Sequence, residues 1–335
     1  MNKPRKIKTG VRGELAESLL FSYLSQTNPS RGSVAKECKV SRVTSGKIAE
    51  VLLNSGLMME RYFALDKCSP CNHLVFKDNV NLLLIDLSSH VYKMSIIGAN
   101  GEVKVSFSYN YDSSISDADN LNIFLSRNGL KIKQKGISWL SIAVLFSDDL
   151  QREYLQTSST QAMLPSIDSK DVIDEAIFSV FHKSPSSHLN VSQAILSALK
   201  FKALGENYVN GISYLYVGSH LSAFHVYGNG SVAVCSPQNL ISIGNTDPSR
   251  LDQYQKEELL IKLINFMDCA FSPNAIIIES CDYEPSDRSA SRINKAIARP
   301  HRHLPAIYTK DSDNSLCNYG IARQTLFDYI RKHIN

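Results

Sequence analysis

The sequence predicts a mixed α/β protein that carries a small helical module at its N-terminus, and three observations support this. First, the initial 54 residues place apolar side chains at helical spacing. Second, Leu82–Asp86, Val91–Ile97 and Val103–Tyr109 have the composition of strands, and Asn100-Gly101 is a typical hairpin turn between the last two. Third, helix-like and strand-like segments alternate beyond residue 116, which is typical of sheets covered by helices.

The composition is that of an ordinary globular protein. A chain of 335 residues and 37.3 kDa usually forms two domains, or one large fold with a small module. With 43% hydrophobic and 20% charged residues it is not a disordered chain, and no apolar run approaches the roughly 18–20 residues of a membrane span. The start of the chain lacks a secretion pattern, and seven thinly spread cysteines favour reduced thiols. We therefore expect a cytoplasmic, nucleoid-associated protein.

The net charge is distributed unevenly. Residues 1–61 contain eleven Lys or Arg against five Glu, a net charge of +6, whereas the whole chain carries +4 and the remainder therefore −2. A small basic segment joined to a mildly acidic body is typical of a module that binds a polyanion. A flexible, solvated basic tail would show the same imbalance, so the pattern within the segment has to decide.

This basic segment is predicted to form three helices with short connections. A first helix spans residues 12–27, and Asn28-Pro29-Ser30 breaks it. Ser33 can cap a short second helix, Val34–Cys38, and Ser41 can cap a third helix.

The third helix and two strands complete the predicted module. Asn54-Ser55-Gly56 ends the helix, and Leu57–Phe63 and Leu74–Phe76 have the composition of strands. The apolar face of the third helix should contain five residues: Val43, Ile48, Val51, Leu52 and Leu53. Three helices and a hairpin in this order are typical of a winged helix-turn-helix, which we expect over residues 1–77.

The side chains of the third helix suit duplex DNA. The first turns of such a helix reach base edges in the major groove, and four residues are expected to project from them: Arg42, Thr44, Ser45 and Lys47. The hydroxyls of Ser41 and Thr44 suit phosphate oxygens. Four more basic residues should attract the DNA backbone: Arg31, Lys36, Arg12 and Lys8. The alternative is a three-helix cap whose basic residues are merely solvated.

Cys68-x-x-Cys71 and the nearby His73 have the residue types of a zinc-binding site. A structural zinc site needs four protein ligands, commonly two such cysteine pairs, and the sequence holds no second pair. We therefore expect reduced cysteines here and no metal.

The segment from Ser33 to Leu57 is similar to the winged helix-turn-helix of ROK-family repressors. Shorter similarities to this family of repressors and sugar kinases follow in the same order: Ile85-Asp86, Asn100–Val103, Tyr214–Gly218, Phe271–Ile278 and Gly320–Gln324. The resemblance implies a two-lobed, actin-like ATPase fold over residues 78–335. One lobe would span about 78–187 plus a closing helix, 319–334, and the other about 188–318.

The family's kinase motifs are altered at the matching positions. The stretch from Asp86 to His90 stands where the kinases have Asp-x-Gly-x-Thr, so that Ser88 replaces a glycine that lets phosphate approach. Val191 matches the general base, and valine cannot accept a proton. Ser242 and Asn245 replace a sugar-binding glutamate and a zinc-ligating histidine. The resemblance thus implies a domain with no catalytic residues, no cofactor and no metal.

These features lead to the hypothesis of a dimeric, sequence-specific transcription regulator that binds double-stranded DNA. Its degenerate ROK-like domain would serve oligomerisation, as a homodimer or a tetramer, and signal input from a small molecule or a protein. One alternative is a sensor that contacts a sugar or sugar phosphate through Asn190 and Gln193. Others are a docking domain for a partner protein and an active carbohydrate kinase.

Overall fold

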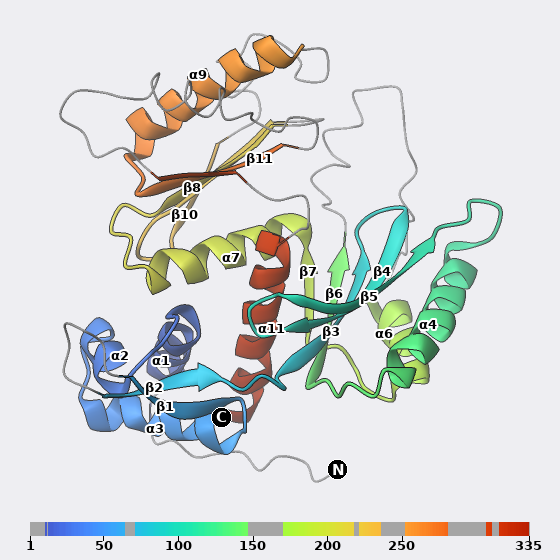
Figure 1. The fold of residues 1–335 in the computed structure, drawn as a ribbon, viewed down its shortest axis with the longest axis horizontal. Coiled ribbons are helices and arrows are strands. Elements are labelled where there is room, and N and C mark those ends of the chain that lie inside the picture. Colours follow the sequence, from blue (N-terminus) through green and yellow to red (C-terminus); the bar gives the residue numbers. More distant parts are fainter. Residues whose placement is uncertain are drawn as a thin grey trace. The chain divides into compact units, whose positions relative to one another are not determined.

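The computed structural model describes residue 11 and residues 13–63, 71–146, 170–217, 221–235, 252–280, 306–309 and 315–334 (Figure 1). Backbone contacts divide the chain into two compact units. The first contains Met1–Ala198 and Leu316–Asn335, and the second contains Leu199–Ser315. The N-terminal helices therefore share a unit with the first sheet and with the end of the chain. The domain boundaries expected near residues 78 and 188 stay predictions.

The chain begins with three helices and a hairpin, here called the N-terminal module: α1 (Gly13–Ser25), α2 (Arg31–Glu37), α3 (Arg42–Asn54), β1 (Met58–Phe63) and β2 (Cys71–Phe76). The two strands pair antiparallel, from Met58 opposite Phe76 to Phe63 opposite Cys71. Fully buried side chains from all three helices form its core: Leu19, Leu20, Val34, Ile48 and Leu52. The elements follow the expected order, because each shows its own local periodicity.

The predicted cap of α2 is wrong, whereas that of α3 is confirmed. Ser30, not Ser33, caps α2: the Ser30 side chain accepts a hydrogen bond from the Ser33 amide, and the Ser33 hydroxyl bonds back to the Ser30 amide. Ser33 is therefore the third helical residue, whose side chain completes the capping box, and the helix begins earlier than expected. Ser41 caps α3, with its hydroxyl 3.1 Å from the Thr44 amide.

The first sheet has the strand order β5-β4-β3-β6-β7 (Figure 1). Its strands are β3 (Asn81–Leu87), β4 (Val91–Gly98), β5 (Val103–Asn110), β6 (Ser141–Phe146) and β7 (Ser187–Asn190), which leads directly into α7 (Val191–Gly205). Strands β3, β4 and β5 form an antiparallel meander, and β6 and β7 add parallel to β3. Helices α4 (Asp117–Gln134) and α6 (Lys170–Phe181) cover one face through a shared apolar core.

Helix α11 (Ser315–Ile334) links the N-terminal module to this sheet. The Phe327 ring packs edge-on against Phe21 of α1, and Arg331 pairs with Glu17 of α1 at 2.7 Å. Asp328, one residue after Phe327, accepts a hydrogen bond of 2.7 Å from Ser187 of β7. The last turns of α11 thus contact both parts of the unit.

Two further residues of α11 make close contacts in the same unit. A Cβ atom on Gly320 would lie 1.9 Å from the carbonyl oxygen of Ala194 in α7, so only glycine permits this approach. Arg323, only 4% exposed, donates a hydrogen bond to the Asn100 side chain and stacks over the Phe76 ring at 4.5 Å. Burial lowers the pKa of Arg323. This arginine joins the end of β2 to the β4–β5 turn.

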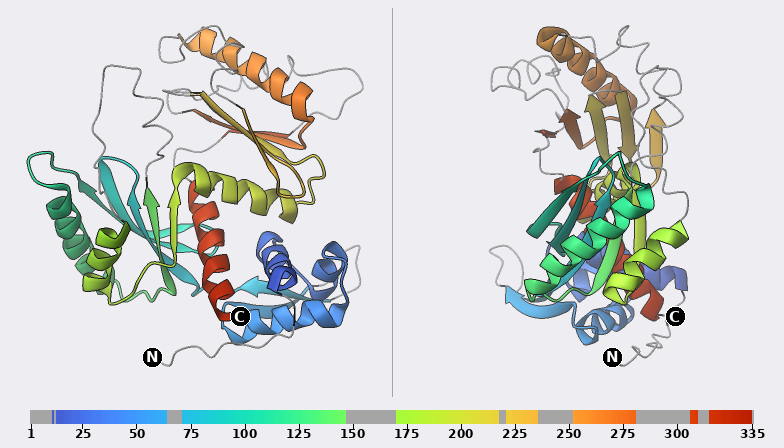
Figure 2. Two further views of the ribbon diagram at one scale, coloured as in Figure 1. Left: turned by 180° about the vertical axis from the view of Figure 1, so that it is seen from behind. Right: turned by 90° about the vertical axis from the view of Figure 1, so that its right-hand side faces the viewer.

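The second unit repeats the connectivity of the first sheet, with the strand order β10-β9-β8-β11-β12. Its elements are β8 (Ile212–Val217), β9 (Leu221–Val226), β10 (Val232–Cys235), α9 (Gln253–Phe271), β11 (Ala275–Ser280) and β12 (Ala306–Thr309). An antiparallel meander is again extended by two parallel strands, and α9 covers the sheet (Figure 2). None of the helices in the described part of the chain is long and apolar enough to cross a membrane.

His225 of β9 should make the second unit sensitive to acid. The ring is fully buried, stacks on Phe271 at 4.5 Å and lies 3.0 Å from the Ser213 hydroxyl. Burial lowers the pKa of His225 from 6.5 to about 4, so protonation favours the unfolded state. The contribution of the neutral His225 ring to the free energy of unfolding should be fully present above pH 6.5 and should be lost as the pH falls toward 4.

Thermal unfolding between pH 7 and pH 4 tests this expectation. In His225→Phe, the midpoint should depend less on pH over this interval than in the wild type. An unchanged dependence would show that other groups cause the acid sensitivity.

Candidate nucleic-acid interface

Helix α3 presents one side to the core and the opposite side to solvent. Four buried residues define the inner side: Ser45, Ile48, Ala49 and Leu52. Val43, Lys47, Glu50 and Asn54 are exposed and follow one another at intervals of four, three and four residues. This spacing places them in a single row along the helix, which we call the outer stripe of α3.

Two predictions about α3 are wrong, and both errors have the same cause. Ser45 is fully buried rather than projecting, with its hydroxyl oxygen 2.6 Å from the Tyr23 hydroxyl of α1. Val43 is 74% exposed rather than part of the apolar face. The predictions followed the polarity of each side chain, whereas the helical period turns position 45 inward and position 43 outward.

Arg42 and Thr44 flank the outer stripe at the start of the helix. Arg42 is exposed, and its guanidinium lies beside Gly32 of α2, where a Cβ atom would be 3.6 Å from Nε. The Thr44 hydroxyl lies 2.9 Å from that of Ser41, so these two polar groups already bond to each other at the helix cap. Two of the expected base-contacting residues, Arg42 and Lys47, therefore reach solvent.

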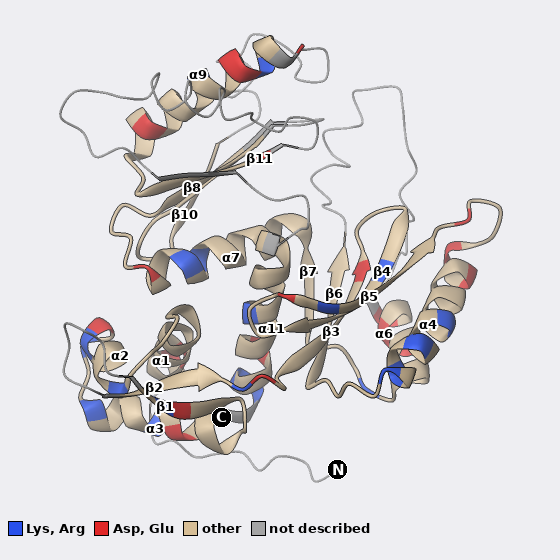
Figure 3. Cartoon of the chain, viewed as in Figure 1, with Lys and Arg blue, Asp and Glu red and all other residues tan. Residues whose placement is uncertain are grey.

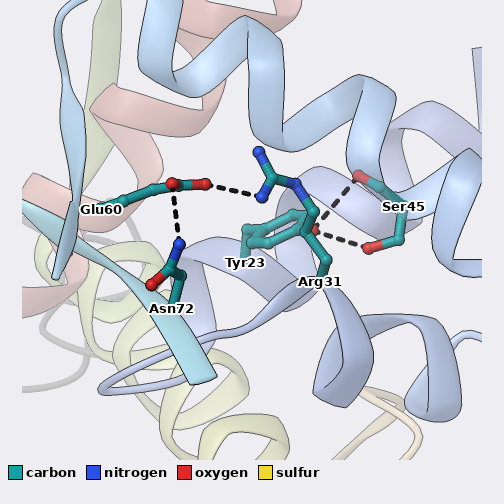
Figure 4. A network of polar contacts seen from close by, with 5 residues as sticks. All are labelled: Tyr23, Arg31, Ser45, Glu60 and Asn72. Carbon is teal, nitrogen blue, oxygen red and sulfur yellow. Dashed lines mark hydrogen bonds and ion pairs between the residues drawn. The ribbon is translucent and has the colours of Figure 1, made fainter. Parts of the chain in front are cut away.

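Arg31 holds the hairpin against the helices (Figure 4). Its side chain passes Gly46 of α3, where a Cβ atom would be 3.6 Å from Arg31 Cδ, and pairs with Glu60 of β1 at 2.6 Å. Glu60 also accepts a hydrogen bond of 3.3 Å from Asn72 of β2. Arg31, expected to attract the DNA backbone, thus has an acidic partner and links α2, α3 and both strands.

The remaining expected contacts divide into two groups. Lys36 is exposed on α2, whereas Arg12 and Lys8 lie outside the described residues.

The residues considered for zinc binding are placed only in part. Cys68 lies outside the described residues. His73 is buried, with Nδ1 2.7 Å from the carbonyl oxygen of Asn28, and this contact connects β2 to the α1–α2 connection. In the part of the chain that the structure describes, no group of three His, Cys, Asp or Glu could hold a metal ion.

Basic residues outnumber acidic ones along α2, α3 and the turn between them, where the acidic residues are Glu37 and Glu50 (Figure 3). Lys36, Lys39, Arg42 and Lys47 are all exposed. Glu37, by contrast, is half-buried and accepts hydrogen bonds from Ser22 of α1 and from Gln26, the residue that follows α1. Burial raises the pKa of its carboxyl group. The acidic group of α2 is therefore turned toward α1.

A second group of interest lies at the carboxyl edge of the first sheet. Asp86 is the last residue of β3 that pairs with β4, opposite Lys93. One position further, Leu87 lies opposite Phe146 of β6, which in turn lies opposite Asn190 of β7. One oxygen of the buried Asp86 carboxyl accepts from both the Ser88 amide, at 2.9 Å, and the Ser88 hydroxyl, at 2.6 Å. Burial raises the pKa of Asp86.

Asn190 and Gln193, the expected ligand contacts, bond to each other. The Asn190 side chain accepts a hydrogen bond from the Gln193 amide, and the Gln193 side chain accepts one from the Asn190 amide, at 2.8 and 3.1 Å. This reciprocal pair closes the start of α7, where Val191 is the first helical residue. The side-chain oxygens predicted to meet a sugar are thus engaged in helix capping.

Comparisons with known proteins identify the fold. No protein-family model and no curated protein sequence matches the chain. Among solved structures, a ROK-family transcriptional regulator described as a homologue of the E. coli MLC protein aligns with a TM-score of 0.55 and 13% identity, covering 95% of this chain and 98% of that one. The chain therefore has the fold of the ROK proteins, with its actin-like, two-lobed architecture.

Two sugar kinases align over about three quarters of this chain with lower scores. The polyphosphate/ATP-glucomannokinase from Arthrobacter has a TM-score of 0.48 and 13% identity, covering 74% of this chain and 98% of that one. The ROK glucokinase from Streptomyces griseus, solved with glucose and AMPPNP, has a TM-score of 0.43 and 11% identity, covering 72% and 98%.

The Tyr23 hydroxyl should stabilise the N-terminal module. Tyr23→Phe removes the bonds to the Ser45 hydroxyl and carbonyl and leaves buried acceptors without this partner. We expect a loss of about 1–2 kcal/mol in the free energy of unfolding, measured by urea denaturation. Tyr62→Phe, on a side chain that is 68% exposed, is the matched control and should leave stability unchanged. Equal stability of the two variants would contradict the assignment.

Proposed function

We propose that this protein is a sequence-specific DNA-binding transcription regulator whose N-terminal module is a winged helix-turn-helix. In this interpretation α2 and α3 are the helix-turn-helix, α3 enters the major groove, and the β1–β2 hairpin is the wing. The observation that carries the proposal is the solvent-facing start of α3. It combines a capped helix N-terminus with two exposed cations, Arg42 and Lys47.

The electrostatics of the module support this interpretation. The amide groups at the start of a helix and its positive dipole end favour phosphate, and Arg42 lies within this first turn. Lys47 follows one turn later on the outer stripe. The net charge of +6 over residues 1–61 adds a sequence-independent attraction that salt weakens.

The similarity to the ROK regulator is a second support. That alignment includes nearly the whole of both chains, so it extends over the N-terminal module as well as the two lobes. That protein is described as a transcriptional regulator, and we propose the same role here.

We infer that the ROK-like domain is catalytically inactive and serves oligomerisation and signal input. Phosphoryl transfer needs bound nucleotide, metal and a proton acceptor together. One oxygen of the Asp86 carboxyl accepts hydrogen bonds from Ser88, and Val191 offers no proton acceptor at the start of α7. In a dimer, two modules would read half-sites about one helical turn apart.

Loss of either exposed cation should weaken specific DNA binding. A site enriched by the wild type from a random duplex library provides the ligand. Arg42→Ala and Lys47→Ala should each bind it about five- to 150-fold more weakly, which corresponds to the 1–3 kcal/mol of a base contact. Arg127→Ala and Lys131→Ala, exposed cations of α4, are the controls and should bind like the wild type. Unchanged affinity of both α3 variants would exclude α3 as the reading helix.

Phosphoryl transfer to sugars should be absent. With ATP, Mg²⁺ and a panel of hexoses and N-acetylhexosamines, ADP release should equal that of the protein without sugar. An active ROK glucokinase in the same assay is the positive control. Sugar-dependent ADP release that Asp86→Asn abolishes would contradict the inference and restore the kinase alternative.

A further inference from the structure

Among the exposed residues of α3, Val43 is apolar and the others are polar. It stands at the second position of α3 and heads the outer stripe, with 74% of its surface exposed. Arg42 precedes it directly, and Lys47 follows it one turn later on the same side. Phosphate is contacted by cationic or hydrogen-bonding groups, whereas an apolar side chain on an inserted helix can contact only sugars and base edges. The exposed valine of the outer stripe therefore points to a contact with a base edge.

The chemistry of the major groove offers one apolar group, the 5-methyl of thymine. The other groups by which the base pairs are distinguished there are hydrogen-bond donors and acceptors, which valine cannot use. Because valine is β-branched, its χ1 angle is strongly restricted in a helix, so its methyl groups are held in place before binding. Burying them against another methyl group therefore costs little side-chain entropy.

We propose that Val43 contacts the 5-methyl group of a thymine and thereby determines one base of the recognised sequence. This inference rests on the proposed function, because it requires α3 in the major groove. A second copy of the chain is the competing occupant of this surface. The flanking Arg42 and Lys47 disfavour it, since a two-fold contact through Val43 would bring like charges together.

Removal of a single methyl group from the DNA tests the proposal. The site enriched by the wild type is synthesised in variants in which one thymine at a time is replaced by deoxyuridine, which keeps base pairing and removes only the methyl. Affinities for wild type and Val43→Ala are compared at one salt concentration. Val209→Ala, at a valine that is 85% exposed in the second unit, is the matched control.

We expect one thymine position in each half-site at which deoxyuridine weakens wild-type binding about fourfold, the value of one buried methyl group. Val43→Ala should bind the thymine and deoxyuridine forms of that position equally, whereas Val209→Ala should retain the fourfold difference. Equal melting temperatures of the three proteins would show that folding is not the cause.

The possible failures are distinguishable. If no duplex is enriched, the proposed function fails and the inference fails with it. If a site is enriched but no deoxyuridine position weakens binding, or if Val43→Ala keeps the full sensitivity, the inference alone fails. Loss of self-association in Val43→Ala with unchanged sensitivity to deoxyuridine would assign the valine to a contact between copies instead.

Discussion

The rotation of α3 about its own axis is the constraint on which the interface depends. Ile48 and Leu52 bury the inner side of the helix in the core, and the hydrogen bonds between Tyr23 and Ser45 fix which side that is. Each residue turns a helix by about 100°, so a change of one position on the inner side would replace the whole outer stripe. Contacts inside the module, on the side of α3 opposite the outer stripe, therefore determine which side chains are proposed to meet DNA.

The elements of the N-terminal module could be predicted because their signals are local. The cap at Ser41 and the stop after Asn54 lie within a few residues of what they control. The hydrogen bond of Ser45 could not be predicted from local signals, because its partner Tyr23 lies on another helix. The exposed position of Val43 could have been predicted from the sequence. The helical period counted from the buried Ile48 and Leu52 places Val43 on the opposite side of the helix.

The larger domain retains the architecture of its fold while its polar groups bond internally. Asn190 and Gln193 were expected to face a ligand, but a sequence pattern cannot tell a binding amide from a capping one. The same holds for Ser88, whose hydroxyl meets the Asp86 carboxyl. The alternating pattern of strands and helices, by contrast, predicted sheets covered by helices, because the apolar spacing of each buried element is visible in the sequence. The repeated strand order of the two sheets was not predicted.

Helix α11 has a mechanical consequence for the first unit. Its 20 residues measure roughly 30 Å, and it meets α7 near one end, at Gly320, and α1 near the other, at Phe327 and Arg331. Because no side chain separates Gly320 from the α7 backbone, there is no slack at this crossing. A displacement of the start of α7 would therefore act directly on α11 at Gly320, and α11 carries the contacts with α1 toward its other end.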